Sequence, residues 1–111
     1  MSALSGVIVA DFSRVLAGPL AAMTMGDLGA NVIKVEPPDG DETRSWLPPV
    51  DAEGRSTYFH TANRNKRSVK LDLKDEGDRA LAFELAMRAD VLIENFRPGT
   101  MARFGLDWET V

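Results

Sequence analysis

Residues 6–36 read GVIVADFSRVLAGPLAAMTMGDLGANVIKVE, and this stretch decides the fold class. Its first β-branched run predicts a strand over Val7–Asp11. Pro19 suits the first turn of a helix, where a missing N–H costs nothing, and Gly29 suits a left-handed helix end. A second β-branched run predicts a strand over Asn31–Val35. A strand, a helix and a strand within about 30 residues form a βαβ unit, which implies parallel strands and a right-handed crossover.

The helix between these two strands carries little polar surface. Its apolar residues are Leu20, Ala21, Met23, Met25 and Leu28. A helix that is apolar on most sides is typical of a buried position. We therefore expect this helix to be mostly buried.

The second half of the chain also alternates strands and helices. Residues 68–73, SVKLDL, alternate in polarity and predict a third strand, and residues 90–96, DVLIENF, predict a fourth. Between them Asp75 is placed to cap a helix, with Asp78 three residues further on. The apolar stripe of that helix follows helical spacing: Ala82, Leu85, Ala86 and Ala89. Alternating elements predict an α/β fold with a mostly parallel sheet.

Less regular segments complete the chain. Residues 37–56 contain four prolines and two glycines, and loops of that length are usually functional or disordered. Trp46 and Leu47 in its middle suggest that it docks on another surface. We expect short helices at residues 58–63 and after residue 97, and Trp108 and Val111 resemble the opening of another helix. Four strands leave a sheet edge uncovered, which suggests the start of a longer chain.

Composition excludes several function classes. A length of 111 residues indicates one small domain, and a formal net charge of −4 argues against a general nucleic-acid binder. The chain has no cysteine, which excludes disulfides and thiolate metal sites, and no metal site is predicted. No apolar run is long enough to cross a bilayer, and the N-terminus lacks the basic leader of a signal peptide. We expect a cytoplasmic protein that binds neither nucleic acid nor membrane.

Cations gather in residues 62–74, ANRNKRSVKLDLK, although the chain is acidic overall. The five members are Arg64, Lys66, Arg67, Lys70 and Lys74. A solvated surface is the ordinary interpretation of such a run. However, ligands of open α/β sheets bind beyond the carboxyl ends of the strands, where Lys70 and Lys74 are predicted to lie. Arg97 and Arg103 follow the fourth predicted strand. Several cations at one edge favour a small polyanionic ligand that carries phosphate.

The sequence gives less support to two other kinds of site, a dinucleotide site and a catalytic histidine or carboxylate. Glu36 ends the second predicted strand, where a ribose-binding acid would lie, but the first turn has no G-x-G-x-x-G and Pro19 removes an amide. A nicotinamide or flavin site is therefore disfavoured. His60 is the sole histidine, and a lone histidine is more often structural. The candidate catalytic carboxylates are Asp11, Asp27, Asp72, Asp90 and Glu94. However, the sequence contains no hydrolase, metalloprotease or P-loop motif.

Several motifs in order resemble the N-terminal part of one enzyme family. The stretches are LSGVIVADFSRVLAGP (residues 4–19), LGANVIKVE (28–36), GDETR (40–44), NRNKRSVKLDLK (63–74) and ADVLIENFRPGTMARFGL (89–106). In this combination the chain resembles the class III CoA-transferases, the CaiB/BaiF or formyl-CoA-transferase-like family. The resemblance implies a Rossmann-like, mostly parallel sheet with flanking helices. It makes residues 1–111 the N-terminal part of a larger CoA-binding domain, in a subunit that forms an interlocked homodimer.

The resemblance also implies the ligand and its contacts. The ligand is coenzyme A or acyl-CoA, bound as a substrate, with no tightly held cofactor. The implied contact residues are Leu16, Ala17, Leu71, Asp72, Leu73, Lys74, Asn95, Phe96, Arg97 and Arg103. Phe96 could pack against adenine, although a core phenylalanine is an equal interpretation. Pro37 replaces a basic residue that some members carry, so that contact is not expected.

The family chemistry is covalent catalysis by an aspartate. That carboxylate attacks an acyl-CoA thioester to form a mixed anhydride, and CoA then passes to a carboxylic acid. In the family this aspartate lies C-terminal of the RFGL stretch, beyond Val111. We therefore expect the catalytic residue outside this chain, and no transferase activity from residues 1–111 alone. Two alternatives stay open: an α-methylacyl-CoA racemase of the same fold, and a non-catalytic remnant that binds CoA.

Overall fold

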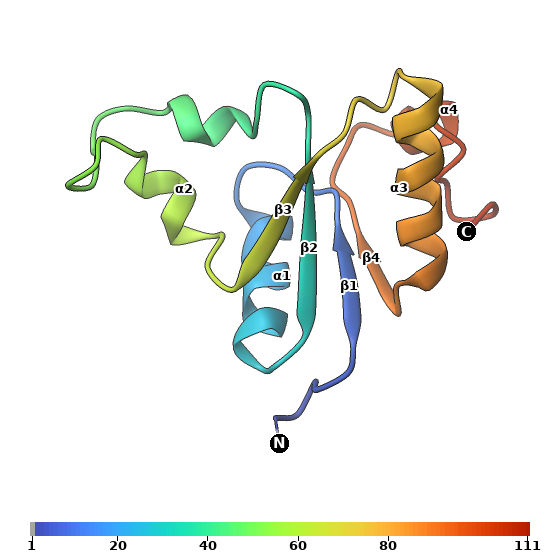
Figure 1. The fold of residues 1–111 in the computed structure, drawn as a ribbon, viewed down its shortest axis with the longest axis horizontal. Helices are drawn as coiled ribbons and strands as arrows, with labels where there is room; N and C mark the ends of the chain where they lie inside the picture. Colours follow the sequence, from blue (N-terminus) through green and yellow to red (C-terminus); the bar gives the residue numbers. More distant parts are fainter. Residues whose placement is uncertain (1) are drawn as a thin grey trace.

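The computed structural model describes residues 2–111, and parallel strands form its centre. β1 (Ile8–Asp11) lies between β2 (Asn31–Glu36) and β4 (Val91–Ile93), and β3 (Lys66–Lys70) forms the edge beside β2 (Figure 1). Every strand pairing within the described residues is parallel, and the order is β3-β2-β1-β4. The predicted α/β fold with a parallel sheet is confirmed.

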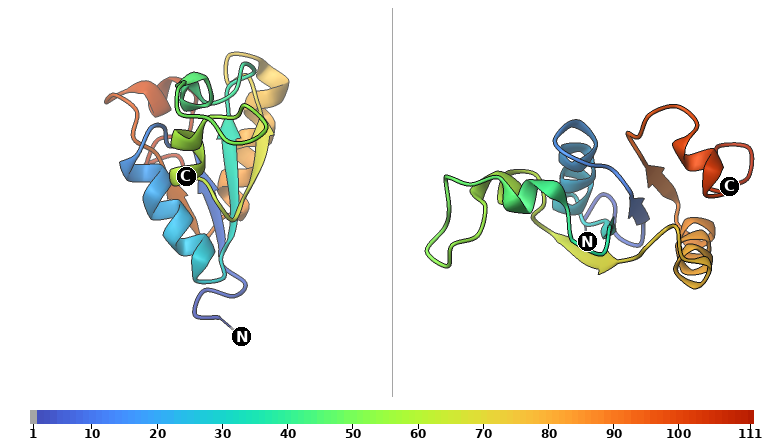
Figure 2. Two further views of the ribbon diagram at one scale, coloured as in Figure 1. Left: turned by 90° about the vertical axis from the view of Figure 1, so that its left-hand side faces the viewer. Right: turned by 90° about the horizontal axis from the view of Figure 1, so that it is seen from above.

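Helices cover both faces of this sheet (Figure 2). α1 (Ala17–Asp27) packs on one face, and the buried residues there are Val9, Ala22, Ala30 and Val32. α3 (Glu76–Arg88) and α4 (Thr100–Arg103) contribute to the core on the other face, whose buried residues are Ala10, Phe12, Val35, Leu71, Ala82, Ala86, Met101 and Leu106. Val9 and Ala10 are neighbours in β1 but serve opposite cores, as the two-residue period of a strand requires.

The burial predicted for α1 is wrong. Pro19, Ala22 and Met23 face inward and are buried, but Leu20 and Leu28 keep 42% and 47% of their surface exposed. A helix that lies on one face of a sheet buries only the side toward that sheet. No other part of the described chain covers the outer side of α1, so its apolar residues there stay exposed.

Strand β3 begins and ends earlier than residues 68–73. Its register follows β2: Val32 pairs with Lys66, and Glu36, the last residue of β2, pairs with Lys70. The Leu71 amide still donates to the Glu36 carbonyl at 2.9 Å, after which the chain turns away. β4 is shorter than residues 90–96 for the same reason, because its partner β1 ends. Strand length here depends on the neighbouring strand.

Residues 37–63 leave the carboxyl end of β2 and form an ordered excursion beside the sheet before β3 begins (Figure 1). It contains a 3₁₀ helix, η1 (Glu42–Ser45), and the short helix α2 (Thr57–Thr61). The rings of Trp46 and Tyr58 lie 4.9 Å apart, so the excursion packs on itself. At the other end of the chain, the amide of Val111 donates to the Asp107 carbonyl at 3.1 Å, so residues 107–111 form a single turn with the hydrogen bond of a helix start.

Residues 2–111 contain no helix long and apolar enough to cross a membrane. They also contain no group of three or more histidine, aspartate or glutamate side chains placed to hold a metal ion.

Close packing at Gly18 gives a stability prediction. A Cβ at Gly18, the second residue of α1, would lie 2.3 Å from the Cβ of Ser13 and 2.7 Å from its Oγ. Ser13 is fully buried and has no space to move. Gly18→Ala should lower the free energy of unfolding by about 1–3 kcal/mol, as overpacking does. Urea denaturation followed by circular dichroism measures this change.

Gly77→Ala is the matched control, because Gly77 is the second residue of α3. A Cβ there meets only the carboxylate of Asp75, at 3.3 Å. This substitution should raise stability by up to about 1 kcal/mol through helix propensity. Equal effects of the two substitutions would contradict the packing argument.

Candidate functional site

The loops that follow β1 and β4 lie side by side at the carboxyl edge of the sheet. The Phe12 amide donates to the Ile93 carbonyl at 2.8 Å, which joins the two loops where they leave the strands. β2 and β3 extend to one side of β1, and β4 lies on the other side. Such a point, where the strand order reverses, is where open α/β sheets bind ligands.

Asn95 joins these two loops a second time. Its Oδ1 accepts from the Arg14 amide at 2.8 Å, and its Nδ2 donates to the Arg14 carbonyl at 2.7 Å. The guanidinium of Arg14 also lies 5.4 Å from the centre of the Phe96 ring. Leu16 and Ala17 follow after Val15 and are exposed at the start of α1. Four of the predicted contact residues therefore meet at this edge.

Arg14 is an anchor that the sequence analysis missed. Its Nη1 donates to the carbonyls of Phe12 at 2.8 Å, Ser13 at 3.1 Å and Val35 at 2.8 Å. Burial lowers the pKa of Arg14, and nearby carboxylates, Asp41 foremost, oppose that effect. An arginine stays charged in such a setting. The charge therefore serves the loop backbone, and no pattern in the sequence predicts this.

The loop after β3 reaches the same core as the loop after β4. Leu71 is buried in the cluster that contains Met101, and Leu73 and Phe96 pack against that cluster. The path from β3 to α3 runs along the carboxyl edge of the sheet (Figure 1). The structure thus gathers the three predicted loop segments, 16–17, 71–74 and 95–97, at one edge.

The polar members of these loops divide into bound and free side chains. Asp72 Oδ1 accepts from the Lys74 amide at 3.0 Å, which closes a local turn. The side chains of Lys74, Arg97 and Arg103 are exposed and form no ion pair within residues 2–111. These three cations are therefore available to an anion.

The five cations at residues 64–74 do not form one cluster. Lys70, predicted at the carboxyl edge together with Lys74, is the last residue of β3, and the first three cations lie elsewhere. Arg64 pairs with Asp27 at 2.7 Å, at the far end of α1. Lys66 is buried and pairs with Asp11 at 2.8 Å. Arg67 donates to a side-chain oxygen at the start of β2. Successive strand residues face opposite sides and advance about 3.3 Å each, so the run is spread along β3.

A network of buried charges occupies the carboxyl half of the face toward α1. Lys34 lies 2.8 Å from Asp41, and both side chains are almost fully buried. Burial alone would raise the pKa of Asp41, but hydrogen bonds from Lys34 and Thr43 lower it. The 3₁₀ helix η1 starts directly after Asp41, so this pair fixes the excursion to β2.

Glu36 belongs to this network and is not a free ribose-binding acid. Arg44 donates to its two oxygens from Nε at 2.7 Å and from Nη2 at 3.0 Å, and Ser68 Oγ donates as well. Burial alone would raise the pKa of Glu36, but these bonds and one from the Asp41 amide lower it to about 2. These contacts explain why a carboxylate is present at position 36 without a bound dinucleotide.

His60 lies in α2, within the excursion. Its Nε2 is 3.1 Å from Asp51 Oδ2, and both residues belong to the excursion. Arg55 pairs with the same carboxylate at 2.9 Å. The structural interpretation of the single histidine agrees with this position.

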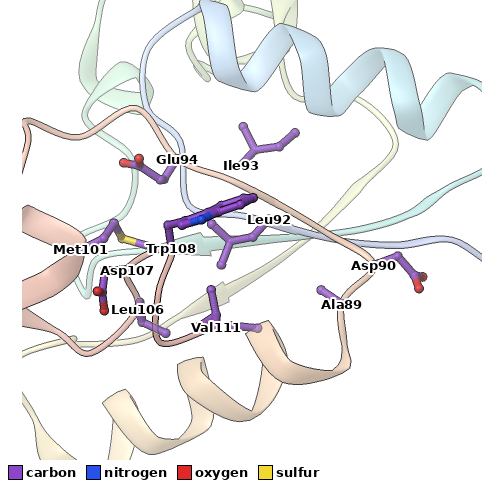
Figure 3. A pocket seen from close by; sticks show the side chains of 11 residues that line it. Ala89, Asp90, Leu92, Ile93, Glu94, Met101, Leu106, Asp107, Trp108 and Val111 are labelled. Atoms are coloured by element: carbon purple, nitrogen blue, oxygen red, sulfur yellow. The ribbon is translucent and has the colours of Figure 1, made fainter.

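A cavity of about 590 Å³ opens beside the edge strand β4 (Figure 3). Leu92, Ile93 and the exposed Trp108 are among the residues that line it. Its charged lining residues are Asp90, Glu94 and Asp107, and no basic side chain contributes. The negative charge of this lining disfavours a polyanion in the cavity. A phosphate group would instead be expected at the exposed cations Lys74, Arg97 and Arg103.

Comparisons with known proteins place this geometry in context. The model of CoA-transferase family III matches residues 4–111. A mouse protein named succinyl-CoA:glutarate CoA-transferase is 50% identical over 113 residues, which cover 100% of this chain and 26% of the relative. An Acetobacter aceti protein named acetyl-CoA:oxalate CoA-transferase is 50% identical over 105 residues, which cover 94% of this chain and 26% of the relative.

A solved structure has the same fold over nearly the whole chain. The crystal structure of a CAIB/BAIF family protein from Brucella suis is similar with a TM-score of 0.93 and 50% identity. The matched region covers 98% of this chain and 30% of the Brucella suis chain. The chain spans about a quarter of the length of the curated relatives it matches.

The buried carboxylate of Glu36 gives a pH prediction. Its pKa falls from 4.5 in the unfolded chain to about 2 in the fold, so its contribution to stability is complete above pH 4.5 and is lost as the pH falls toward 2. Between about pH 6 and pH 3 the unfolding free energy should fall by roughly 2 kcal/mol more in the wild type than in Glu36→Gln. Urea denaturation across this range measures both slopes. Glu109→Gln, on an exposed residue, should keep the wild-type slope, and equal slopes for Glu36→Gln would contradict the prediction.

Proposed function

The chain belongs to CoA-transferase family III, and from this premise we propose that it forms the N-terminal part of the coenzyme A site of an acyl-CoA:carboxylate CoA-transferase. Coenzyme A carries a pyrophosphate and a 3′-phosphate, so its recognition needs cations at one edge of the sheet. The observation that carries the proposal is that the loops after β3 and β4 and the helix α4 share one core, while their cations Lys74, Arg97 and Arg103 have no carboxylate partner in residues 2–111.

Each loop has a separate task in this proposal. Arg97 and Arg103 bind phosphate oxygens, because a guanidinium offers two parallel donors, and Lys74 adds a point charge. Leu16 and Ala17 present an exposed apolar surface to the pantetheine arm. Phe96, already packed against the core, offers the edge of its ring to the adenine side.

The reaction we propose passes through an enzyme aspartate that is not assigned to any residue of this chain. Its carboxylate oxygen bonds to the thioester carbon, the C–S bond breaks, and the CoA thiolate leaves a mixed anhydride. The thiolate attacks the aspartyl carbonyl of that anhydride, and the donor acid leaves as a carboxylate. The acceptor carboxylate then reverses the two steps and departs as a new acyl-CoA.

Short dicarboxylates are the acceptors that the names of the relatives support, since those names mention glutarate and oxalate. A homodimer of interlocked subunits and a cytoplasmic location stay predictions of the family resemblance and of the composition. The α-methylacyl-CoA racemase alternative receives no support from the names of these relatives.

Calorimetric titration with CoA and with dephospho-CoA tests the proposal. The 111-residue chain should bind CoA, and dephospho-CoA should bind about tenfold more weakly, because one set of charge-assisted hydrogen bonds is lost. Arg103→Gln should weaken CoA in a similar way, and added salt should reduce the difference between the two ligands.

Arg55→Gln is the control for this titration. Arg55 is an exposed arginine on the excursion, paired with Asp51 at 2.9 Å, and its replacement should leave CoA affinity unchanged. Absence of any heat with CoA, or equal affinity for CoA and dephospho-CoA, would contradict the proposed site.

A further inference from the structure

The side-chain amide of Asn95 forms hydrogen bonds with both backbone groups, N–H and C=O, of a single residue, Arg14. Oδ1 accepts from the Arg14 N–H at 2.8 Å, and Nδ2 donates to the Arg14 carbonyl at 2.7 Å. The two residues are 81 positions apart in the chain. A paired contact of this kind fixes the orientation of the peptide groups on both sides of Arg14. It leaves one lone pair and one N–H of the amide for any ligand.

The residue that follows this clamp has an unfavourable backbone conformation. Val15 has a φ of 71°, in the left-handed region. A β-branched side chain there is a true outlier, because its methyl groups crowd the backbone. Such a conformation persists only where the surrounding structure holds it, and it is most common at ligand-binding sites.

Other contacts hold the residues before Val15 but not Val15 itself. The guanidinium of Arg14 donates to the carbonyls of Phe12 and Ser13, and Lys34 Nζ donates to the Ser13 carbonyl at 3.4 Å. Within the described chain, Asn95 is the one side chain that binds both backbone groups of Arg14. Asn95 therefore holds the backbone immediately before the strained residue, Val15.

We propose that Asn95 is a positioning residue: it holds Arg14 and Val15 in the strained conformation that presents Leu16 and Ala17 to coenzyme A. This inference rests on the proposed function for the ligand, but the clamp itself does not. It assigns Asn95 a different task from the direct CoA contact that the family resemblance implies. A loop that is already in its bound shape loses less conformational freedom when the ligand arrives.

A double-mutant cycle separates positioning from direct contact. Asn95→Ala should weaken CoA binding about tenfold, since two hydrogen bonds of ordinary strength are lost. Glycine adopts a positive φ without strain, so Val15→Gly should make the clamp less necessary. In the Val15→Gly background, Asn95→Ala should therefore cost no more than about threefold.

Asn31→Ala is the matched control. Asn31 lies at the amino end of β2, where its side-chain oxygen accepts from Arg67. CoA affinity should not change in this variant. An equal loss for Asn95→Ala with valine or with glycine at position 15 would overturn the positioning role, because a direct contact with CoA does not depend on residue 15.

Amide hydrogen exchange tests the clamp without any ligand. In the wild type the Arg14 N–H is bonded to Asn95 Oδ1, and Asn95→Ala should accelerate its exchange about tenfold or more. Unchanged exchange at Arg14 would overturn the inference whatever the CoA titration gives. If the wild type binds no CoA but Asn95→Ala still accelerates exchange at Arg14, the proposed ligand is refuted and the clamp is established.

Discussion

The buried ion pair between Lys66 and Asp11 joins the edge strand β3 to β1 across the strand between them. The ammonium of Lys66, in β3, lies 2.8 Å from the carboxylate of Asp11, the last residue of β1, and both side chains are almost fully buried. β2 lies between these strands, so the contact spans three strands. Removal of one partner of a buried pair typically costs about 3–5 kcal/mol, because the other charge is left alone. This contact adds a side-chain link to the backbone pairing that sets the register of β3 on β2.

The same carboxylate also shapes the loop after β1. The second oxygen of Asp11 accepts from the Ser13 amide at 3.0 Å, and Ser13 is packed so closely that only glycine fits at position 18. The sheet face toward α1 is thus apolar beneath the helix. Near the carboxyl ends of the strands the same face is ionic, and there Lys34 contacts Asp41. The excursion and the loop after β1 are therefore attached to a single charged layer.

Local sequence signals predicted the elements that depend on local interactions. The strand at Val7–Asp11 and the helix capped by Asp75 were predicted because β-branched runs and capping side chains act within a few residues. Strand ends, the exposed side of α1 and the partner of Lys66 depend on neighbours that are distant in the sequence. The clamp of Asn95 on Arg14 joins positions 81 residues apart, and no pattern in one sequence indicates such a pair. Motif likeness predicted which loops contact the ligand, but only geometry separates anchoring residues from exposed ones.

An acidic protein can offer a site to a polyanion because its charges are compensated in pairs. Lys34 and Lys66 are each neutralised by a buried carboxylate and contribute little field outside the protein. Lys74 and Arg97 have no such partner in the described residues, and they lie on loops that share one core. Because charges within about 10 Å dominate the local potential at physiological salt, a formal net charge of −4 does not prevent a positive field at that edge. The burial of a cation, rather than its abundance in the sequence, decides whether it can bind a ligand.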